Sequence, residues 1–138
     1  MAFRLKSGFP ENFTIEVPVT AGVAIAEGDL LDINGNVLQR ATSSSTILTI
    51  IGVAAETIST AATLIKVIPV CQGQIWEADC TNSTASNQLF ESCALTDHGH
   101  LSNTSSDVTG PTAVFLPFAI TGTTTMLGEF TRVQSTTA

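Results

Sequence analysis

The sequence has 138 residues, of which 43% are hydrophobic and only 12% are charged. This length suits one domain with its own hydrophobic core and short tails. The charged share is about half that of an average globular protein, and Thr, Ser, Asn and Gln supply most of the other polar surface. Lys and Glu, which favour helices, are scarce, whereas Thr and Val suit a pleated surface. We therefore expect a mainly β fold.

The formal net charge is −7, with five Lys and Arg residues in the whole chain. Binding to a nucleic-acid backbone depends on clustered basic side chains, so we expect no nucleic-acid partner. No run approaches the roughly 18 apolar residues that span a bilayer, and the first residues lack the apolar core of a secretory signal. We expect neither a membrane segment nor export, and we expect the three cysteines to be free thiols in a reducing compartment.

The first 12 residues follow neither a helical nor a strand period. Apolar and basic side chains alternate irregularly with turn formers, namely Phe3, Arg4, Leu5, Lys6, Gly8, Phe9 and Pro10. This pattern is typical of an extended N-terminal arm over residues 1–12. Its apolar side chains need a surface to cover, and two interpretations stay open: the arm lies on another subunit, or it folds back onto its own domain.

The next segments have the features of strands and tight turns. Alternation from Phe13 to Val17 predicts a strand, which Pro18 interrupts. The Asn34-Gly35 pair lies between apolar residues on both sides and predicts a tight hairpin. The apolar, β-branched run over residues 47–55 is too short for a typical helix, so it predicts a central strand that is buried on both faces.

The second half predicts further strands around a less regular middle. Residues 63–70 and 73–79 have strand character, and Trp76 is expected in the core with its indole N–H hydrogen-bonded. Residues 80–107 are irregular, with at most one short helix near 85–91 that a Ser or Thr within 83–86 would cap. Strands are again expected over 112–120, where Pro117 indicates an edge or a bulge, and over 126–133.

These elements describe a small β-barrel or sandwich, and not an α/β fold. We expect a single β-rich domain over residues 13–133, preceded by the arm and followed by a polar tail over 134–138. Strand order is not determined by such patterns.

A search for catalytic patterns finds none. The candidate metal ligands are Cys71, Cys80, Cys93, His98 and His100, and their spacing does not match the close Cys or His pairs of zinc sites. His98 and His100 would share a strand face if a strand formed there, but a polar turn and buried thiols explain the same residues better. The carboxylate pairs Glu27/Asp29 and Glu77/Asp79 fit the outward faces of strand ends. We predict no catalytic residue, no metal, no cofactor and no enzymatic activity.

Several short motifs recur in the order and spacing found in a known family of viral proteins. They are Val19–Gly22, Glu27–Leu31, Ile50–Ala54, Ile68–Val70, Gly73–Ala78 and Leu127–Phe130. Over residues 13–133 the chain resembles the capsid decoration proteins of tailed bacteriophages, also called cement or head-stabilising proteins. Residues 80–107 do not align with this pattern, and they could form a loop insertion that faces solvent or a receptor.

The resemblance implies a β-tulip-like body on the outer surface of the virion, made in the host cytoplasm. It implies a homotrimer whose N-terminal arm contacts the major capsid protein. The expected arm contacts are Phe3, Arg4, Leu5, Lys6, Phe9 and Phe13, and the expected effect is stabilisation of the assembled shell. The alternative function is a non-catalytic binding module, such as a fibre domain or a carbohydrate-recognising β domain.

Overall fold

The structure is a computed structural model that describes residues 1–8, 13–20 and 22–131. The fold is mainly β, as the sequence predicts. The elements in chain order are β1 (Phe3–Ser7), β2 (Ile15–Pro18), β3 (Leu30–Asn34), β4 (Val37–Arg40), β5 (Ile50–Ala54), β6 (Leu64–Pro69), β7 (Ile75–Asp79), the 3-10 turn η1 (Ser86–Gln88), β8 (Ala94–Asp97), β9 (His100–Ser102), β10 (Phe115–Ile120) and β11 (Thr125–Phe130).

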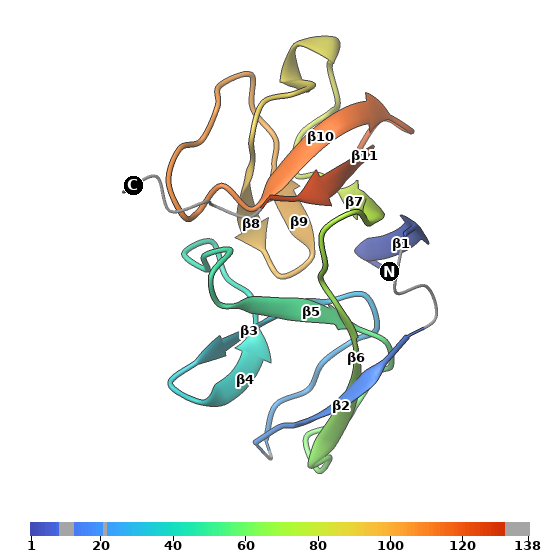
Figure 1. Cartoon of the computed structure of the whole chain (residues 1–138), viewed down its shortest axis with the longest axis vertical. Helices are drawn as coiled ribbons and strands as arrows, with labels where there is room; N and C mark the ends of the chain where they lie inside the picture. Colours follow the sequence, from blue (N-terminus) through green and yellow to red (C-terminus); the bar gives the residue numbers. More distant parts are fainter. Residues whose placement is uncertain (9–12, 21, 132–138) are drawn as a thin grey trace.

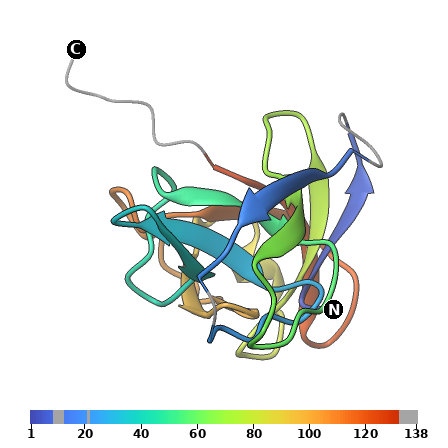
Figure 2. The ribbon, with the colours of Figure 1, turned by 90° about the horizontal axis from the view of Figure 1, so that it is seen from below.

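The described strands form three antiparallel sheets (Figure 1). A four-stranded sheet has the order β1-β7-β11-β10, and a five-stranded sheet has the order β2-β6-β5-β3-β4. The pair β8-β9 lies beside the four-stranded sheet and is joined to it by isolated bridges at Cys80 and Cys93. Both views place the two N-terminal strands on the same side of the molecule (Figure 1 and Figure 2).

Two hydrophobic clusters lie on opposite faces of the five-stranded sheet. The larger cluster joins this sheet to the four-stranded sheet and to β8-β9, and it contains Leu30 and Val53. The smaller cluster lies on the other face and contains Leu31 and Ala54. Because successive side chains of a strand point to opposite faces, neighbours in β3 and β5 enter different clusters.

The central position of β5 confirms the prediction from the apolar run, because β5 lies in the middle of its sheet with both faces covered. The strand is shorter than the run: it begins at Ile50, and Leu48 lies in the preceding turn with 74% of its surface exposed. Trp76 is buried as expected, and its Nε1 donates to Gln74 Oε1 at 3.1 Å.

The hairpin prediction is confirmed, with the turn centred one residue later than expected. Asn34 pairs with Val37, so Gly35 and Asn36 are the central residues, with φ angles of 58° and 66°. Positive φ at both central positions defines a type I′ turn, whose twist matches that of the two strands. Asn is one of the few residues other than Gly that adopt this conformation readily.

The irregular middle segment is more ordered than its composition indicates. Asn82 and Asn103 hold it together: Asn82 Nδ2 donates to Asn103 O at 2.9 Å, and Asn103 Nδ2 donates to Asn82 O at 3.0 Å. Leu95 and Leu101, from β8 and β9, enter the larger core cluster. The segment therefore contributes to the core, and it is not simply a loop insertion that faces solvent.

The short helix is a single 3-10 turn, η1, and the expected hydroxyl cap is wrong. The N-cap residue is Ala85, whose backbone N–H donates to Gln88 Oε1 at 3.0 Å. The Gln88 side chain thus reaches back to the start of the turn, so no Ser or Thr is needed there.

Pro117 occupies the place that the sequence predicts. It lies in β10, an edge strand of the four-stranded sheet, where the pairing with β11 shifts register between Pro117 and Ala119. Proline cannot donate a ladder hydrogen bond, so an edge with a bulge accommodates it. Among the described residues, no helix has the length and apolar character needed to cross a membrane.

Candidate functional site

A polar pocket lies beside the β3–β4 hairpin, and the hairpin supplies one of its walls. Asp32 pairs with Gln39 across the two strands, so both side chains lie on one face of the sheet. Asn34 lies on the same face because it is two residues from Asp32 in the strand. The turn that follows β4 supplies the opposite wall. The described residues lining the pocket are Asp32, Ile33, Asn34, Gln39, Thr42, Ser44, Ser45, Thr46 and Thr49.

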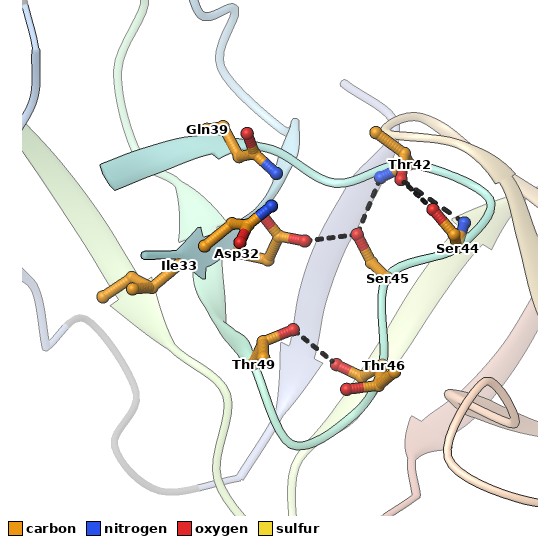
Figure 3. Close-up of a pocket in the computed structure, with 9 residues that line it drawn as sticks. Asp32, Ile33, Gln39, Thr42, Ser44, Ser45, Thr46 and Thr49 are labelled. Carbon is orange, nitrogen blue, oxygen red and sulfur yellow. Dashed lines mark hydrogen bonds between the residues drawn. The ribbon is translucent and has the colours of Figure 1, made fainter. Parts of the chain in front are cut away.

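The turn after β4 is held by its own hydroxyl groups. Ser45 N donates to Thr42 O at 3.0 Å, and Thr42 N donates to Ser45 Oγ at 2.8 Å. Thr49 Oγ1 donates to Thr46 O at 3.1 Å. Figure 3 shows these side chains arranged around one opening, with Gln39 and Asp32 facing the turn from the strands. Short side chains that bond to the local backbone are what make this Ser- and Thr-rich segment a defined turn.

Asp32 is the only carboxylate among the described lining residues, and just 3% of its surface is exposed. Its Oδ2 accepts a hydrogen bond from Ser45 Oγ. Its Oδ1 is buried and has no hydrogen-bond partner among the described residues. A buried carboxylate oxygen without a partner is costly, because the lost hydration is not replaced. The pocket therefore has an unused acceptor in its wall.

The pocket has a volume of about 210 Å³. None of its described lining residues is Lys, Arg or His. The hydroxyl and amide groups can donate or accept hydrogen bonds, and a carboxylate is chiefly an acceptor. This arrangement can bind a ligand rich in donors. Ser45 and Asp32 form a hydroxyl–carboxylate pair, but the described lining contains no His to complete a Ser-His-Asp arrangement.

The predicted arm residues do not share one location. Phe3 is fully buried in the larger core cluster, where it packs against Phe130 with ring centroids 5.5 Å apart. Strand β1 pairs with β7, which places Phe3 opposite Ala78. Residues Phe3–Ser7 therefore fold back onto their own domain, which is the second of the two interpretations left open by the sequence. The prediction that Phe3 contacts a partner is wrong, because its side chain is fully buried within this chain.

Arg4 contacts two carboxylates of β7. Its Nε donates to Glu77 Oε1 at 2.8 Å and one terminal nitrogen donates to Asp79 Oδ1 at 2.9 Å. The Arg4 hydrogen bond holds the pKa of Glu77 below its ordinary value. The Lys6 ammonium lies 3.8 Å from the same Glu77 carboxylate. Glu77 and Asp79 are thus ion-pair partners that attach β1 to the sheet.

The other arm residues differ in exposure. Leu5 is half-buried and packs against the larger core cluster, and Lys6 is exposed. Phe13 precedes β2 and has 49% of its surface exposed. Phe9 lies outside the described residues.

The two histidines lie in and beside the turn between β8 and β9, and each has its own partner. His98 Nε2 is 3.8 Å from Asp29 Oδ1, while His100 Nδ1 is 2.9 Å from Asp97 Oδ1. The segment is the polar turn that the sequence favoured, and it does not place both rings on one strand. Within residues 1–8, 13–20 and 22–131, no three His, Cys, Asp or Glu side chains gather as a metal site would require.

Cys80 and Cys93 are free and buried, whereas the free Cys71 is half-buried. Desolvation raises the pKa of Cys80 to about 12 and that of Cys93 to about 11. Because the thiolate is the reactive form, these two thiols are poor nucleophiles near neutral pH. Their burial agrees with the expected role as core residues.

The Asp32 pocket was not predicted from the sequence. Two signals indicate it: an acidic residue between apolar neighbours in a strand, and a run of hydroxyl residues shortly after the hairpin. Neither signal predicts that the turn packs against Asp32, because that contact depends on the path of the chain after β4.

The fold and these contacts define the class of the chain as a mainly β protein with antiparallel sheets. No protein-family model matches the sequence, and a search of curated proteins found no match.

Proposed function

We propose that this chain is a structural virion protein without enzymatic activity, which binds the outer surface of an assembled phage capsid and stabilises it as a homotrimer. The observation that carries the proposal is the exposed edge strand β2. This strand forms one edge of the five-stranded sheet, and Ile15 on it is 38% exposed. Phe13, directly before it, is still more exposed.

An open strand edge with exposed apolar side chains is a surface that another chain can extend. Both N-terminal strands lie on this side of the molecule (Figure 2). The contact set that we now propose is Lys6, Phe13 and Ile15, together with Phe9 from outside the described residues. Arg4 and Leu5 support β1 and are less available, and Phe3 is removed from the set.

The proposed mechanism is preferential binding. A protein that binds only the assembled, expanded shell stabilises that state by mass action, and many copies add their effects. Closed symmetry would place three copies around a threefold axis, where each presents the same surface to the major capsid protein. No catalytic residue is needed for this work.

The first test is the mass in solution, followed by co-sedimentation. Light scattering should give about three times 14.4 kDa, and the protein should pellet with empty, expanded capsids of the phage that carries its coding sequence. The variant Phe13→Ser should weaken pelleting by about tenfold or more, through loss of a buried aromatic contact. Leu48→Ser is the matched control, because it also replaces an exposed apolar side chain by Ser, but in the turn before β5. This variant should pellet as the unmodified chain does.

The alternative function, a non-catalytic binding module, is favoured by a different observation, the polar pocket at Asp32. A monomer that does not sediment with capsids would overturn the decoration proposal and leave this alternative as the better account. The two functions are thus separated by one pair of measurements.

A further inference from the structure

One carboxylate oxygen of Asp32, Oδ1, has no hydrogen-bond partner among the described residues, so a ligand could supply a hydrogen-bond donor to it. The carboxylate is held from one side by Ser45 and is otherwise buried in the pocket wall. The terminal torsion of an aspartate side chain is soft, and we expect it to adjust so that a ligand donor can reach Oδ1. A donor from the ligand would then complete the hydrogen bonding of a group that the chain itself leaves incomplete.

The charge of the lining excludes one class of ligand. Asp32 is ionisable, and the described lining carries no cationic side chain to offset it. An anion such as phosphate or a carboxylate would lie beside a like charge, with no Lys or Arg to bind it. The pocket is therefore unsuited to anionic ligands.

The donor set also argues against a tightly bound divalent metal ion. Calcium sites use six to eight oxygens, and their affinity rises with the number of carboxylates. This pocket offers a single carboxylate among neutral hydroxyl and amide groups. Its volume of about 210 Å³ is also several times the ~30 Å³ share of one water, which is more room than a single ion fills.

Neutral groups that both donate and accept dominate the rest of the lining. Gln39, Thr46 and Thr49 are examples: Gln39 faces the opening from β4, whereas Thr46 and Thr49 belong to the turn between β4 and β5 (Figure 3). We propose that the pocket binds a small neutral polyhydroxyl ligand about the size of one monosaccharide, with one ligand hydroxyl donating to Asp32. This site does not depend on the proposed capsid binding, since it lies on β3, β4 and the turn that follows them.

The affinity should be modest. No aromatic side chain is among the described lining residues, so the ligand has no ring to stack on and relies on hydrogen bonds alone. Hydrogen bonds that replace those to water each contribute only a small net free energy. We therefore expect dissociation constants in about the millimolar range.

The test is titration of the full chain with glucose, galactose, mannose and N-acetylglucosamine, followed by NMR of the labelled protein. We expect at least one of these sugars to shift the amide signals of Gln39, Thr46 and Thr49 with saturation. Asp32→Asn should weaken that binding by about tenfold or more. Asp107→Asn, which removes an exposed carboxylate elsewhere, should bind as the unmodified chain does.

A second variant guards against misfolding of Asp32→Asn. Gln39→Leu removes one pocket amide at a half-buried strand position and keeps a side chain of similar length, and it should weaken binding by several-fold. The proposal is overturned if none of the four sugars shifts these signals at about 50 mM, or if Asp32→Asn and Gln39→Leu both fold and bind the sugars as tightly as the unmodified chain does. It is also overturned if calcium chloride alone saturates the same signals, because the site would then be a cation site.

Discussion

Gln74 is the residue on which the hydrogen bonding around Trp76 depends. Its Oε1 accepts from the Trp76 indole and from Cys71 N at 2.7 Å, while its Nε2 donates to Pro69 O at 3.0 Å. Gln74 is itself buried. One amide side chain therefore satisfies three polar groups between β6 and β7, and their positions depend on it.

We predict that Gln74→Ala destabilises the protein by about 2–4 kcal/mol, because buried donors lose their acceptor at about 1–3 kcal/mol each. Urea unfolding followed by the fluorescence of the single Trp measures this loss. Gln72→Ala, at an exposed position nearby, is the matched control and should change stability by less than about 0.5 kcal/mol. Equal midpoints for the two variants would contradict the assigned role.

At the scale of the element, β5 tolerates no side chain at Gly52. A Cβ atom built there would meet Val67 Cγ1 at 2.5 Å and would also overlap Ile68 O, both from the adjacent strand β6. Because β5 is the central strand, it cannot move away from this contact without disturbing both clusters.

We expect Gly52→Ala to destabilise the protein by about 3 kcal/mol, at the upper end of the usual cost of overpacking. Thermal unfolding by circular dichroism gives the difference. Gly99→Ala is the control, because its new Cβ would have Ala2 Cβ at 3.3 Å near the chain terminus, where a small shift relieves it. If both variants unfold at the same temperature, the packing argument fails.

The attachment of β1 to β7 is expected to depend on pH through Glu77. Its folded pKa is lowered from 4.5 by the hydrogen bond from Arg4. A carboxylate with a lowered folded pKa contributes stability above its unfolded pKa, and this contribution is lost as the pH falls through the folded value.

We predict that Glu77→Gln costs about 1 kcal/mol near pH 7 and that the difference from the unmodified chain shrinks toward zero as the pH falls through the lowered folded pKa of Glu77. Urea midpoints at a series of pH values measure the difference. Glu129→Gln, at an exposed position on β11, should show no such loss near neutral pH. A cost for Glu77→Gln that stays constant with pH would reject the ion pair as its cause.

At the scale of the whole molecule, the larger core cluster couples the sheets. Leu30 and Val53 come from the five-stranded sheet, and they share this cluster with Trp76 and Phe115 of the four-stranded sheet. A backbone hydrogen bond also joins the five-stranded sheet to the turn between β8 and β9, since Leu30 N donates to His98 O at 2.9 Å. Neither sheet can separate without exposing this shared core.

We therefore predict one cooperative unfolding transition. Leu31 lies in the smaller cluster, away from Trp76, so Leu31→Ala tests whether the sheets respond together. The variant should lower stability by about 2–5 kcal/mol and shift Trp76 fluorescence and far-UV circular dichroism to the same new midpoint. Leu48→Ala, at the exposed turn, should shift neither. Midpoints that separate in Leu31→Ala would show that the sheets unfold independently.

The sequence by itself determined the features that depend on neighbouring residues. A tight hairpin follows from the Asn and Gly residues at 34–36 between two apolar segments, although the structure shows that its turn is centred on Gly35 and Asn36. The central strand follows from an apolar run with no polar face to expose. Pro117 marked an edge with a bulge because it lacks a donor wherever the rest of the chain lies.

Only the tertiary structure decided features that depend on distant partners. Phe3 could have covered another subunit, and its burial beside Phe130 required β7 to pair with β1. The Asp32 pocket likewise required the turn at Ser45 to fold against β3. The local sequence pattern determines which face of a strand is apolar. It does not determine which other element packs against that face, because long-range contacts depend on the packing of the whole chain.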